Sequence, residues 1–387
     1  MSVLVAPRIR TEQRVAEVGW FSALCGEDLE YLGVPDVKLT STFEHCSAIF
    51  KKTEQLGYQS ILMPSAYAVG QEPLVFAGAM AVAAPKLQQL VALRMGEIHP
   101  PMLARHIATL DHMLKGKLTV NIISSELPGE TISPADRYTR SEEVLQILRQ
   151  AWTQDHIDFD GQFYKIKLAT TKPVTPYQKG GPLLYFGGIS EPAREACAKY
   201  CDVFLMWPET EEKLGETMAD MSERAARQGR VIDFGLRIHV IVRETEEEAR
   251  AFARRMISRL DDATTAKIRS NINDFKYEGT KRQDALRAAS KDDYIEELVW
   301  SGIGRVRAGC GSALVGDPDQ IVEKLNRYLD MGMRSFIFSG YPHLQECDLF
   351  AKYVLPRLKT AHLPALQGRV GNHLPTTPLT LPLLQEA

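Results

Sequence analysis

The segment 234–244, FGLRIHVIVRE, carries the side chains with the clearest capacity for chemistry. Its residues alternate at a period of two, which is typical of a β-strand, and Arg237 and His239 share one face. A helix pattern follows at once, because Thr245 and Glu248 have the spacing of a capping box. A strand that leads directly into a helix belongs to a βα unit, whose strands are covered on both faces. The sequence therefore predicts that Arg237 and His239 are buried.

A buried guanidinium and a buried imidazole allow two interpretations. Without partners, their burial costs several kcal/mol. One interpretation is a satisfied internal ion pair, whose role would be structural. The other is a site that binds an anion or performs catalysis. The strand by itself favours neither interpretation.

The order of strand-like and helical patterns predicts the fold. Eight strand-like runs alternate with helices over roughly 340 residues, which fits a (β/α)8 TIM barrel with insertions. An open, doubly wound sheet is the alternative, but no GxGxxG motif opens the first helix. The strand-like runs lie at 18–24, 60–63, 91–101, 118–125, 182–190, 203–207, 234–244 and 335–342.

The other segments are expected to decorate one barrel that spans residues 18–360. Residues 1–17 form a polar leader, and 157–166, IDFDGQFYKI, has the pattern of a β-hairpin. An insertion at about 260–295 is charged and has a weak apolar pattern, which predicts a mobile lid rather than core. The extension 361–387 is rich in Pro and Leu, and is either disordered or an arm on a neighbouring subunit.

Bulk composition argues against several classes of protein. Of the 387 residues, 44% are hydrophobic and 25% are charged, which is ordinary for a globular protein. The net charge of -3, without a basic run, argues against nucleic acid and acidic membrane surfaces as partners. No stretch approaches the ~20 apolar residues of a membrane span, so we expect a soluble, cytoplasmic protein.

The cysteine pattern gives little support for a metal site. Six cysteines are scattered along the chain, and only Cys197 and Cys201 are spaced like neighbours on a helix. We interpret the cysteines as buried thiols in a reducing cytosol, with zinc as the less favoured alternative. The sequence predicts no metal ligands.

Polar residues follow the strand-like runs at the ends where a TIM barrel places its active site. They include no pair of carboxylates of the kind that glycosidases use, and no cluster of His and acidic residues at metal spacing. Hydrolytic and metal-dependent activities are therefore poorly supported. The residues at these ends are Cys25, Ser65, Ser124, Ser125, Gly187 to Ser190, Trp207 and Ser339 to Tyr341.

The segment GGISEPAREAC gives the best local indication of a cofactor. Gly187 and Gly188 allow a close approach of the backbone, and Ser190 can cap the helix that follows. The free N–H groups and the positive dipole end of that helix favour a phosphate. The alternative is an ordinary turn between a strand and a helix.

Four segments together carry a resemblance to a known family. They are LYFGGISE, FGLRIHVIVRETEEEA, RVRAGCGSALVGDP and SGYPHLQE. In this order, within residues 18–358, they resemble the flavin-dependent alkanesulfonate monooxygenases of the bacterial luciferase-like family. The resemblance implies a (β/α)8 barrel that receives reduced FMN (FMNH2) from a separate NAD(P)H-dependent flavin reductase. It also implies a reaction in which O2 oxygenates an organosulfonate and releases sulfite and an aldehyde.

The same resemblance implies roles for particular residues. Two arginines can hold the permanent anion of a sulfonate, a histidine can exchange a proton near neutral pH, and a tyrosine can donate a hydrogen bond. The implied catalytic residues are Arg237, His239, Arg307 and Tyr341, with Trp207, Arg237 and Arg307 contacting the substrate. The implied cofactor residues are Ser124, Tyr138, Gly187, Gly188 and Ser190.

The chain departs from the family pattern around the mouth of the barrel. Val69 stands where the typical cysteine would be, and the segments 24–33 and 121–130 differ from their family counterparts. Polar residues there could bond hydroxyl groups, which favours a polar sulfonate or a sulfosugar such as sulfoquinovose. These residues are Glu27, Asp28, Tyr67, Gln71 and Ser125.

Two other functions stay open, and the assembly is expected to be oligomeric. One alternative is a deazaflavin-dependent oxidoreductase with the same fold. The other is a flavin-binding protein without catalytic activity. In each case we expect a homodimer or a homotetramer.

Overall fold

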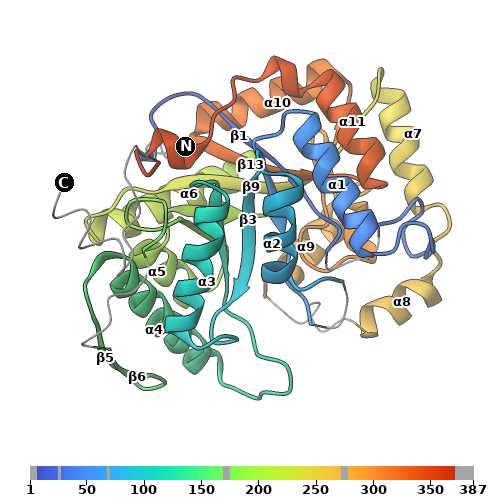
Figure 1. Ribbon diagram of the computed structural model, residues 1–387. Coiled ribbons are helices and arrows are strands. Elements are labelled where there is room, and N and C mark those ends of the chain that lie inside the picture. Colours follow the sequence, from blue (N-terminus) through green and yellow to red (C-terminus); the bar gives the residue numbers. More distant parts are fainter. Residues whose placement is uncertain (1–6, 25–27, 68–69, 169–174, 272–277, 371–387) are drawn as a thin grey trace.

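A closed barrel of eight parallel strands forms the centre of the molecule (Figure 1). The computed structural model describes residues 7–24, 28–67, 70–168, 175–271 and 278–370. The order around the barrel is β1-β2-β3-β4-β7-β8-β9-β13, and β13 pairs with β1 to close it. The TIM barrel predicted from the sequence is therefore confirmed.

Each of the eight strand-like runs overlaps a barrel strand, and helices lie between the strands. The strands are β1 (Glu17–Phe21), β2 (Ser60–Met63), β3 (Gln88–Arg94), β4 (Leu118–Ile123), β7 (Leu183–Phe186), β8 (Val203–Met206), β9 (Asp233–Val242) and β13 (Met333–Ser339). The surrounding helices are α1 (Phe43–Gln55), α2 (Pro73–Ala83), α3 (Pro100–Met113), α4 (Pro134–Thr153), α5 (Glu191–Tyr200), α6 (Glu211–Arg227), α7 (Glu246–Ile257), α10 (Pro318–Met331) and α11 (His343–Tyr353). The capping box of Thr245 and Glu248 opens α7 as predicted.

Strand β9 extends beyond the C-terminal end of its neighbour β8. It has ten residues, and only its first part, up to Leu236, pairs with β8. Its last part pairs with the short strand β12 (Ala313–Gly316), which begins opposite His239. Arg237 and His239 therefore lie beyond the end of β8, at the mouth of the barrel.

The insertion predicted at about 260–295 has regular secondary structure in its described part. It contains the helices α8 (Asp262–Asn271) and α9 (Glu278–Ala289), and β10 (Tyr294–Glu296) and β11 (Val299–Trp300) extend the barrel sheet through β12. Val299 and Trp300, just beyond the predicted insertion, are buried. The predicted hairpin is confirmed as the antiparallel pair β5 (Ile157–Asp160) and β6 (Lys165–Leu168).

Both ends of the described chain cover the end of the barrel where the strands begin, opposite the mouth. Leu363, in the short helix α12 (Leu363–Leu366), is fully buried against the apolar residues of the barrel interior. Its backbone N–H donates to Glu17 Oε2 at 2.8 Å, and the backbone N–H of Thr11 donates to Asp233 Oδ1 at 2.8 Å. The first part of the predicted extension therefore packs on its own barrel, and its leucines from Leu374 onward lie outside the described residues.

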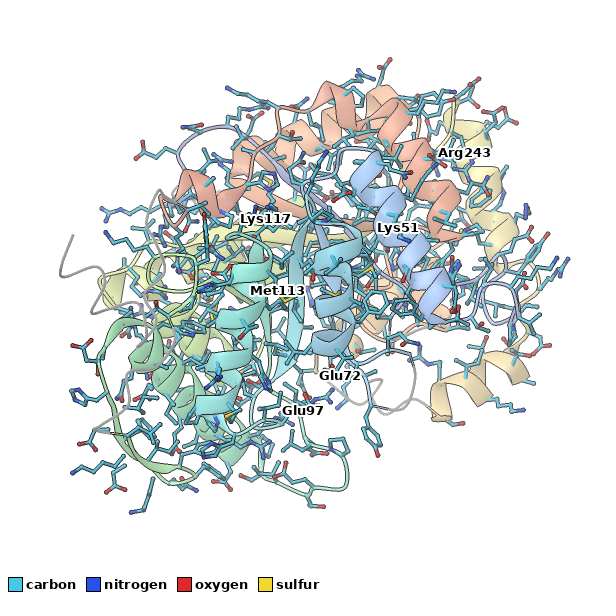
Figure 2. The ribbon with its side chains drawn as sticks, in the orientation of Figure 1. Lys51, Glu72, Glu97, Met113, Lys117 and Arg243 are labelled. Atoms are coloured by element: carbon cyan, nitrogen blue, oxygen red, sulfur yellow. The ribbon has the colours of Figure 1, made fainter. Side chains whose placement is uncertain are left out.

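An apolar groove lies on the outside of the barrel between α2 and α3 (Figure 2). It has a volume of about 610 Å³ and is lined by side chains such as Val75 and Met113. Val75 is 77% exposed and Met113 is 43% exposed. Glu72 and Glu97 lie at one end of this surface, and Lys117 lies at the other. No helix in the described part of the chain is long and apolar enough to cross a membrane.

Candidate active site

A chain of hydrogen bonds links Arg237 to His239 at the mouth of the barrel. Both side chains are buried, and Ser339 of the adjacent strand β13 lies beside His239 in register. Arg237 Nη2 donates to Ser339 Oγ at 2.7 Å, and Ser339 Oγ lies 2.7 Å from His239 Nδ1. His239 Nε2 lies 3.2 Å from the carbonyl oxygen of Cys310. Because a carbonyl only accepts, Nε2 carries the proton and Nδ1 accepts from the Ser339 hydroxyl.

The surroundings of His239 hold its ring neutral. Burial lowers the pKa of His239 well below its ordinary value of 6.5, and the charges of Arg237 and Arg307 lower it further. A neutral imidazole has one donor and one acceptor, which matches the two shorter contacts of the ring, to Cys310 and Ser339, while Arg237 Nη2 lies 3.5 Å from Nε2. This environment does not support the expected proton exchange by His239 near neutral pH.

Arg307 and Tyr341 lie beside the hydrogen-bonded group of Arg237, Ser339 and His239. Arg307 Nη1 donates to the Tyr341 hydroxyl at 2.6 Å, and the Tyr341 ring lies 5.3 Å from the His239 ring. The guanidinium carbons of Arg237 and Arg307 lie 4.2 Å and 5.3 Å from the centre of the Phe21 ring. The structure thus brings together every residue of the predicted catalytic set. Their roles in catalysis stay a prediction.

Asp28 fixes the turn that carries Tyr341, which sequence reasoning missed. Asp28 is fully buried, and both of its carboxylate oxygens accept from the backbone N–H of His343, at 3.0 and 3.1 Å. His45 Nε2 and the backbone N–H of Leu29 bond the same carboxylate. Asp28 therefore caps α11 from the loop after β1. Its oxygens are already engaged, which does not fit the expected contact with substrate hydroxyls.

His343 lies behind Tyr341 and is also neutral. Trp20 Nε1 donates to His343 Nδ1 at 3.2 Å, and the His343 ring meets the Tyr341 ring edge-on at 5.4 Å. Burial is the main reason that the pKa of His343 falls to about 4. Trp20 and His343 thus support the Tyr341 side of the site without carrying charge at neutral pH.

The lowered pKa of His343 predicts a measurable pH dependence of stability. Its folded pKa lies below the unfolded value, so the unfolded chain binds more protons as the pH falls below about 6.5. Relative to His343→Asn, whose amide oxygen can still accept from Trp20, the wild type should lose about 2 kcal/mol of unfolding free energy between pH 7 and pH 5. Urea denaturation at both pH values measures this difference. Equal losses in the two proteins would show that His343 does not titrate in this way.

The predicted cofactor residues gather at the ends of β4 and β7. A Cβ atom on Gly187 would lie 2.4 Å from the Leu205 carbonyl oxygen, and one on Gly188 would lie 2.6 Å from the Ala193 Cβ, so both positions require glycine. Ser190 is the N-cap residue of α5, but its hydroxyl lies 2.9 Å from the Tyr138 hydroxyl instead of capping the helix.

A second hydroxyl pair lies beside this turn. Ser124 Oγ, at the end of β4, donates to Ser141 Oγ on α4 at 2.8 Å. Tyr138 belongs to the same helix, one turn earlier. Hydroxyl groups and a glycine backbone beside a helix N-terminus form a cradle whose donors fit a phosphate group.

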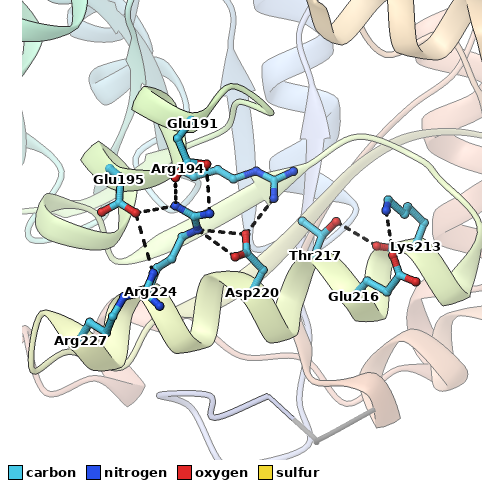
Figure 3. Close-up of polar contacts among 9 residues, drawn as sticks. All are labelled: Glu191, Arg194, Glu195, Lys213, Glu216, Thr217, Asp220, Arg224 and Arg227. Atoms are coloured by element: carbon cyan, nitrogen blue, oxygen red, sulfur yellow. Dashed lines mark hydrogen bonds and ion pairs between the residues drawn. The ribbon is translucent and has the colours of Figure 1, made fainter. Parts of the chain in front are cut away.

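An ion-pair network fixes helix α5 against α6 next to the cradle (Figure 3). Arg224 of α6 pairs with Glu191, Glu195 and Asp220, and these carboxylates raise the pKa of Arg224. Glu191 is the first residue of α5. Its pairing with Arg224 reduces the repulsion that its negative charge would exert on an anion at the helix N-terminus.

Trp207 lies between the end of β8 and the inserted helix α9. It is 37% exposed, and a Cβ atom on Gly279 would lie 2.7 Å from its ring. Helix α9 is held there by Gln283, whose Nε2 donates to the Pro208 carbonyl at 2.7 Å. The insertion is therefore docked on the mouth beside Trp207. Its function as a lid stays a prediction.

The other rim residues differ in what they can contact. Ser125 Oγ accepts from Arg94 Nε at 2.6 Å, and Arg94, an inward-facing residue at the end of β3, was not singled out from the sequence. Tyr67 is 80% exposed, whereas Gln71 Nε2 donates to the Ser41 carbonyl. The remaining rim positions, Cys25, Glu27 and Val69, lie outside the described residues.

The described thiols are buried and lie apart from any metal-binding cluster in the described part of the chain. Cys46, Cys197, Cys201, Cys310 and Cys347 are free and buried, which confirms the interpretation of these five as buried thiols. Among the residues described, no group of three or more His, Cys, Asp or Glu side chains could hold a metal ion.

Comparisons with known proteins agree with this geometry. The family model for luciferase-like monooxygenases matches residues 18–335. The chain is 52% identical to a sulfoquinovose monooxygenase of Agrobacterium fabrum, covering 97% of this chain and 98% of that protein. It is 50% identical to one of Novosphingobium aromaticivorans, covering 88% and 96%. A solved riboflavin lyase with a modified FMN shares the fold, with a TM-score of 0.74, 15% identity, and coverage of 92% and 96%. The chain therefore belongs to the luciferase-like monooxygenase family.

Proposed function

We propose that this protein is the oxygenase of a two-component system that uses reduced FMN and O2 to cleave the carbon–sulfur bond of an organosulfonate. The observation that carries this proposal is the placement of two guanidinium groups, those of Arg237 and Arg307, over one ring at the mouth of the barrel. The names of the two close relatives support a sulfonate substrate.

The site suits the head group of a sulfonate. A sulfonate is a permanent anion with three acceptor oxygens, and arginine offers fixed donors that need no proton transfer to bind it. The names of the two relatives favour sulfoquinovose as the substrate. The paired side chains of Arg94 and Ser125 lie at the rim, where they can meet the hydroxyl groups of a sugar.

The cradle at the ends of β4 and β7 fits the phosphate of FMN. Tyr138 and Ser190 would supply hydroxyl donors, and the Gly187–Gly188 turn would supply backbone N–H groups. When bound, reduced FMN supplies two electrons and activates O2. A separate NAD(P)H-dependent reductase would deliver it. Some proteins with this fold use a deazaflavin instead, as a solved alcohol dehydrogenase with F420 shows.

The protein side chains would bind, orient and shield. Arg237 and Arg307 hold the sulfonate, Tyr341 fixes Arg307, and the neutral His239 holds Ser339 toward Arg237. Trp207 and helix α9 exclude water. One oxygen atom of O2 becomes the aldehyde oxygen and the other leaves in water, while the carbon–sulfur bond breaks and releases bisulfite.

Sulfite release tests the proposal. The protein is mixed with FMN, NADPH, a flavin reductase and sulfoquinovose or simple alkanesulfonates, with and without O2. We expect sulfite and aldehyde in equal amounts, and only with O2. Failure to release sulfite from any sulfonate, together with turnover of another substrate, would reject desulfonation. Turnover of a deazaflavin without O2 would support the hydride-transfer alternative, and tight binding of oxidised FMN without turnover would support a carrier.

We also propose that two copies pair through the groove between α2 and α3. Helices with apolar outward faces are usually covered by another molecule, and Val75 and Val82 are each 77% exposed. The surface is acidic at the end with Glu72 and Glu97 and basic at the end with Lys117 (Figure 2). A two-fold axis across the groove would place the acidic end of one copy against the basic end of the other.

Charged residues introduced at the groove and along the exposed side of α2 are expected to separate the copies. The double variant Val75→Glu and Val82→Glu would bury unpaired carboxylates in the interface, so a dimer should become a monomer. Sedimentation analysis at micromolar concentration measures the mass. Val37→Glu is the matched control, because Val37 is 87% exposed on another surface and should leave the mass unchanged. A double variant with the mass of the wild type would place the interface elsewhere.

A further inference from the structure

Phe21 lies at the boundary between the apolar interior of the barrel and its polar mouth. It is the last residue of β1 and is 9% exposed. Below it, its ring belongs to the interior apolar cluster that includes Leu62, Leu205 and Ile337. Near the mouth, both Arg237 and Arg307 place their guanidinium groups over this ring, at 4.2 Å and 5.3 Å. One phenyl ring is therefore the shared support of two cations.

The shared ring offsets part of the repulsion between the two guanidinium groups. Two guanidinium groups near one another repel, and partial burial makes the repulsion stronger. The face of a phenyl ring carries negative potential, so it attracts each cation, and the attraction grows where water is excluded. Each arginine also has its own neutral acceptor, Ser339 for Arg237 and Tyr341 for Arg307. Phe21 is thus a contact that the two guanidinium groups share, beside the hydroxyl group that each of them meets separately.

We propose that Phe21 is a positioning residue that sets the spacing and tilt of Arg237 and Arg307, and thereby the affinity of the mouth for a tetrahedral oxyanion head group. The inference rests on the proposed function only for the identity of that anion as a sulfonate. Phe21 itself would contact the arginines, with no part in the chemical step. A leucine at this position would keep the apolar packing below the ring and remove the attraction for both cations.

Three variants separate positioning from packing. Phe21→Leu removes the aromatic face, Phe21→Tyr keeps it, and Phe336→Leu is the matched control. Phe336 is fully buried in β13 and stacks on Phe338, in the outer apolar cluster away from the arginines. Calorimetry of the full chain with sulfate and with methanesulfonate measures anion affinity. Steady-state kinetics with sulfoquinovose separate KM from kcat, and Tm reports folding.

Phe21→Leu should weaken the binding of both anions about 5- to 30-fold and raise KM by a similar factor, with kcat and FMN affinity changed less than about threefold. Phe21→Tyr should restore most of the affinity. Phe336→Leu should lower Tm without changing anion affinity. Wild-type sulfate affinity in Phe21→Leu, or an equal loss in Phe336→Leu, would overturn the inference.

The experiment also distinguishes this inference from the proposed function. Sulfate binding needs neither turnover nor flavin. A loss of sulfate affinity in Phe21→Leu without sulfite formation by the wild type would support the role of Phe21 and reject the sulfonate reaction. Sulfite formation by the wild type, together with unchanged sulfate affinity in Phe21→Leu, would support the sulfonate reaction and reject the role of Phe21.

Discussion

Replacing Arg237 with alanine is expected to lower kcat/KM for a sulfonate by about 30- to 5,000-fold. Loss of one partner of a desolvated charge pair costs about 2 to 5 kcal/mol, and each 1.4 kcal/mol is a factor of ten. Arg237 would form such a desolvated pair with a bound anion, because it is 3% exposed and donates to Ser339 away from water. Steady-state rates of sulfite release at several sulfonate concentrations measure the effect.

Two controls show whether the loss comes from anion recognition. Arg237→Lys keeps the charge but lacks the planar fork of the guanidinium, so its activity should lie between those of the wild type and the alanine variant. Arg227→Ala removes a half-exposed arginine of α6 and should leave kcat/KM unchanged. An alanine variant that binds and turns over sulfonate normally would remove Arg237 from the anion site.

The barrel and the burial of its key residues could be predicted from the sequence because both depend on local patterns. The alternation in 234–244 placed Arg237 and His239 on one face, and the capping box at Thr245 showed that the strand continues into a helix. Parallel strands of a closed barrel leave an inward face no exposure to solvent. Both residues are accordingly less than 4% exposed.

The partners of these residues could not be predicted, because they depend on how distant strands align. Ser339 lies opposite His239 through the register of β13 on β9. The Cys310 carbonyl and the Phe21 ring reach the site from the segment just before β12 and from β1. No local periodicity encodes such contacts. Strands such as β11, with two residues, are likewise too short to show a pattern.

Asp28 illustrates the same limit for a polar residue. Its type and its place in a loop near the mouth suggested a contact with substrate. The fold instead brings the start of α11 to it, and the backbone N–H of His343 occupies both carboxylate oxygens. Pro342, the N-cap residue of α11, has no side-chain acceptor, so the cap must come from elsewhere in the chain. Only the folded structure shows that the two segments meet.

Replacing His239 with alanine is expected to lower kcat/KM about 100-fold, the equivalent of about 2.7 kcal/mol. The change removes the acceptor of the Ser339 hydroxyl and the donor to the Cys310 carbonyl. The Ser339 hydroxyl then loses its orientation toward Arg237. His239→Asn should keep more activity than His239→Ala, because an amide oxygen can still accept from Ser339. Sulfite release rates of the two variants, with protein of equal Tm, measure the difference.

A double-mutant cycle with Arg237 tests whether the two residues act through one chain of hydrogen bonds. If they do, the double alanine variant should lose little more than Arg237→Ala alone, because the second change removes an orientation that no longer matters. The pH dependence gives an independent test. Since burial and two arginines lower the pKa of His239 well below 6.5, its ring stays neutral from pH 6 to 8, and the ratio of wild-type to His239→Asn rates should be constant there. A wild-type inflection near pH 6.5 that His239→Asn abolishes would show that His239 exchanges a proton during turnover.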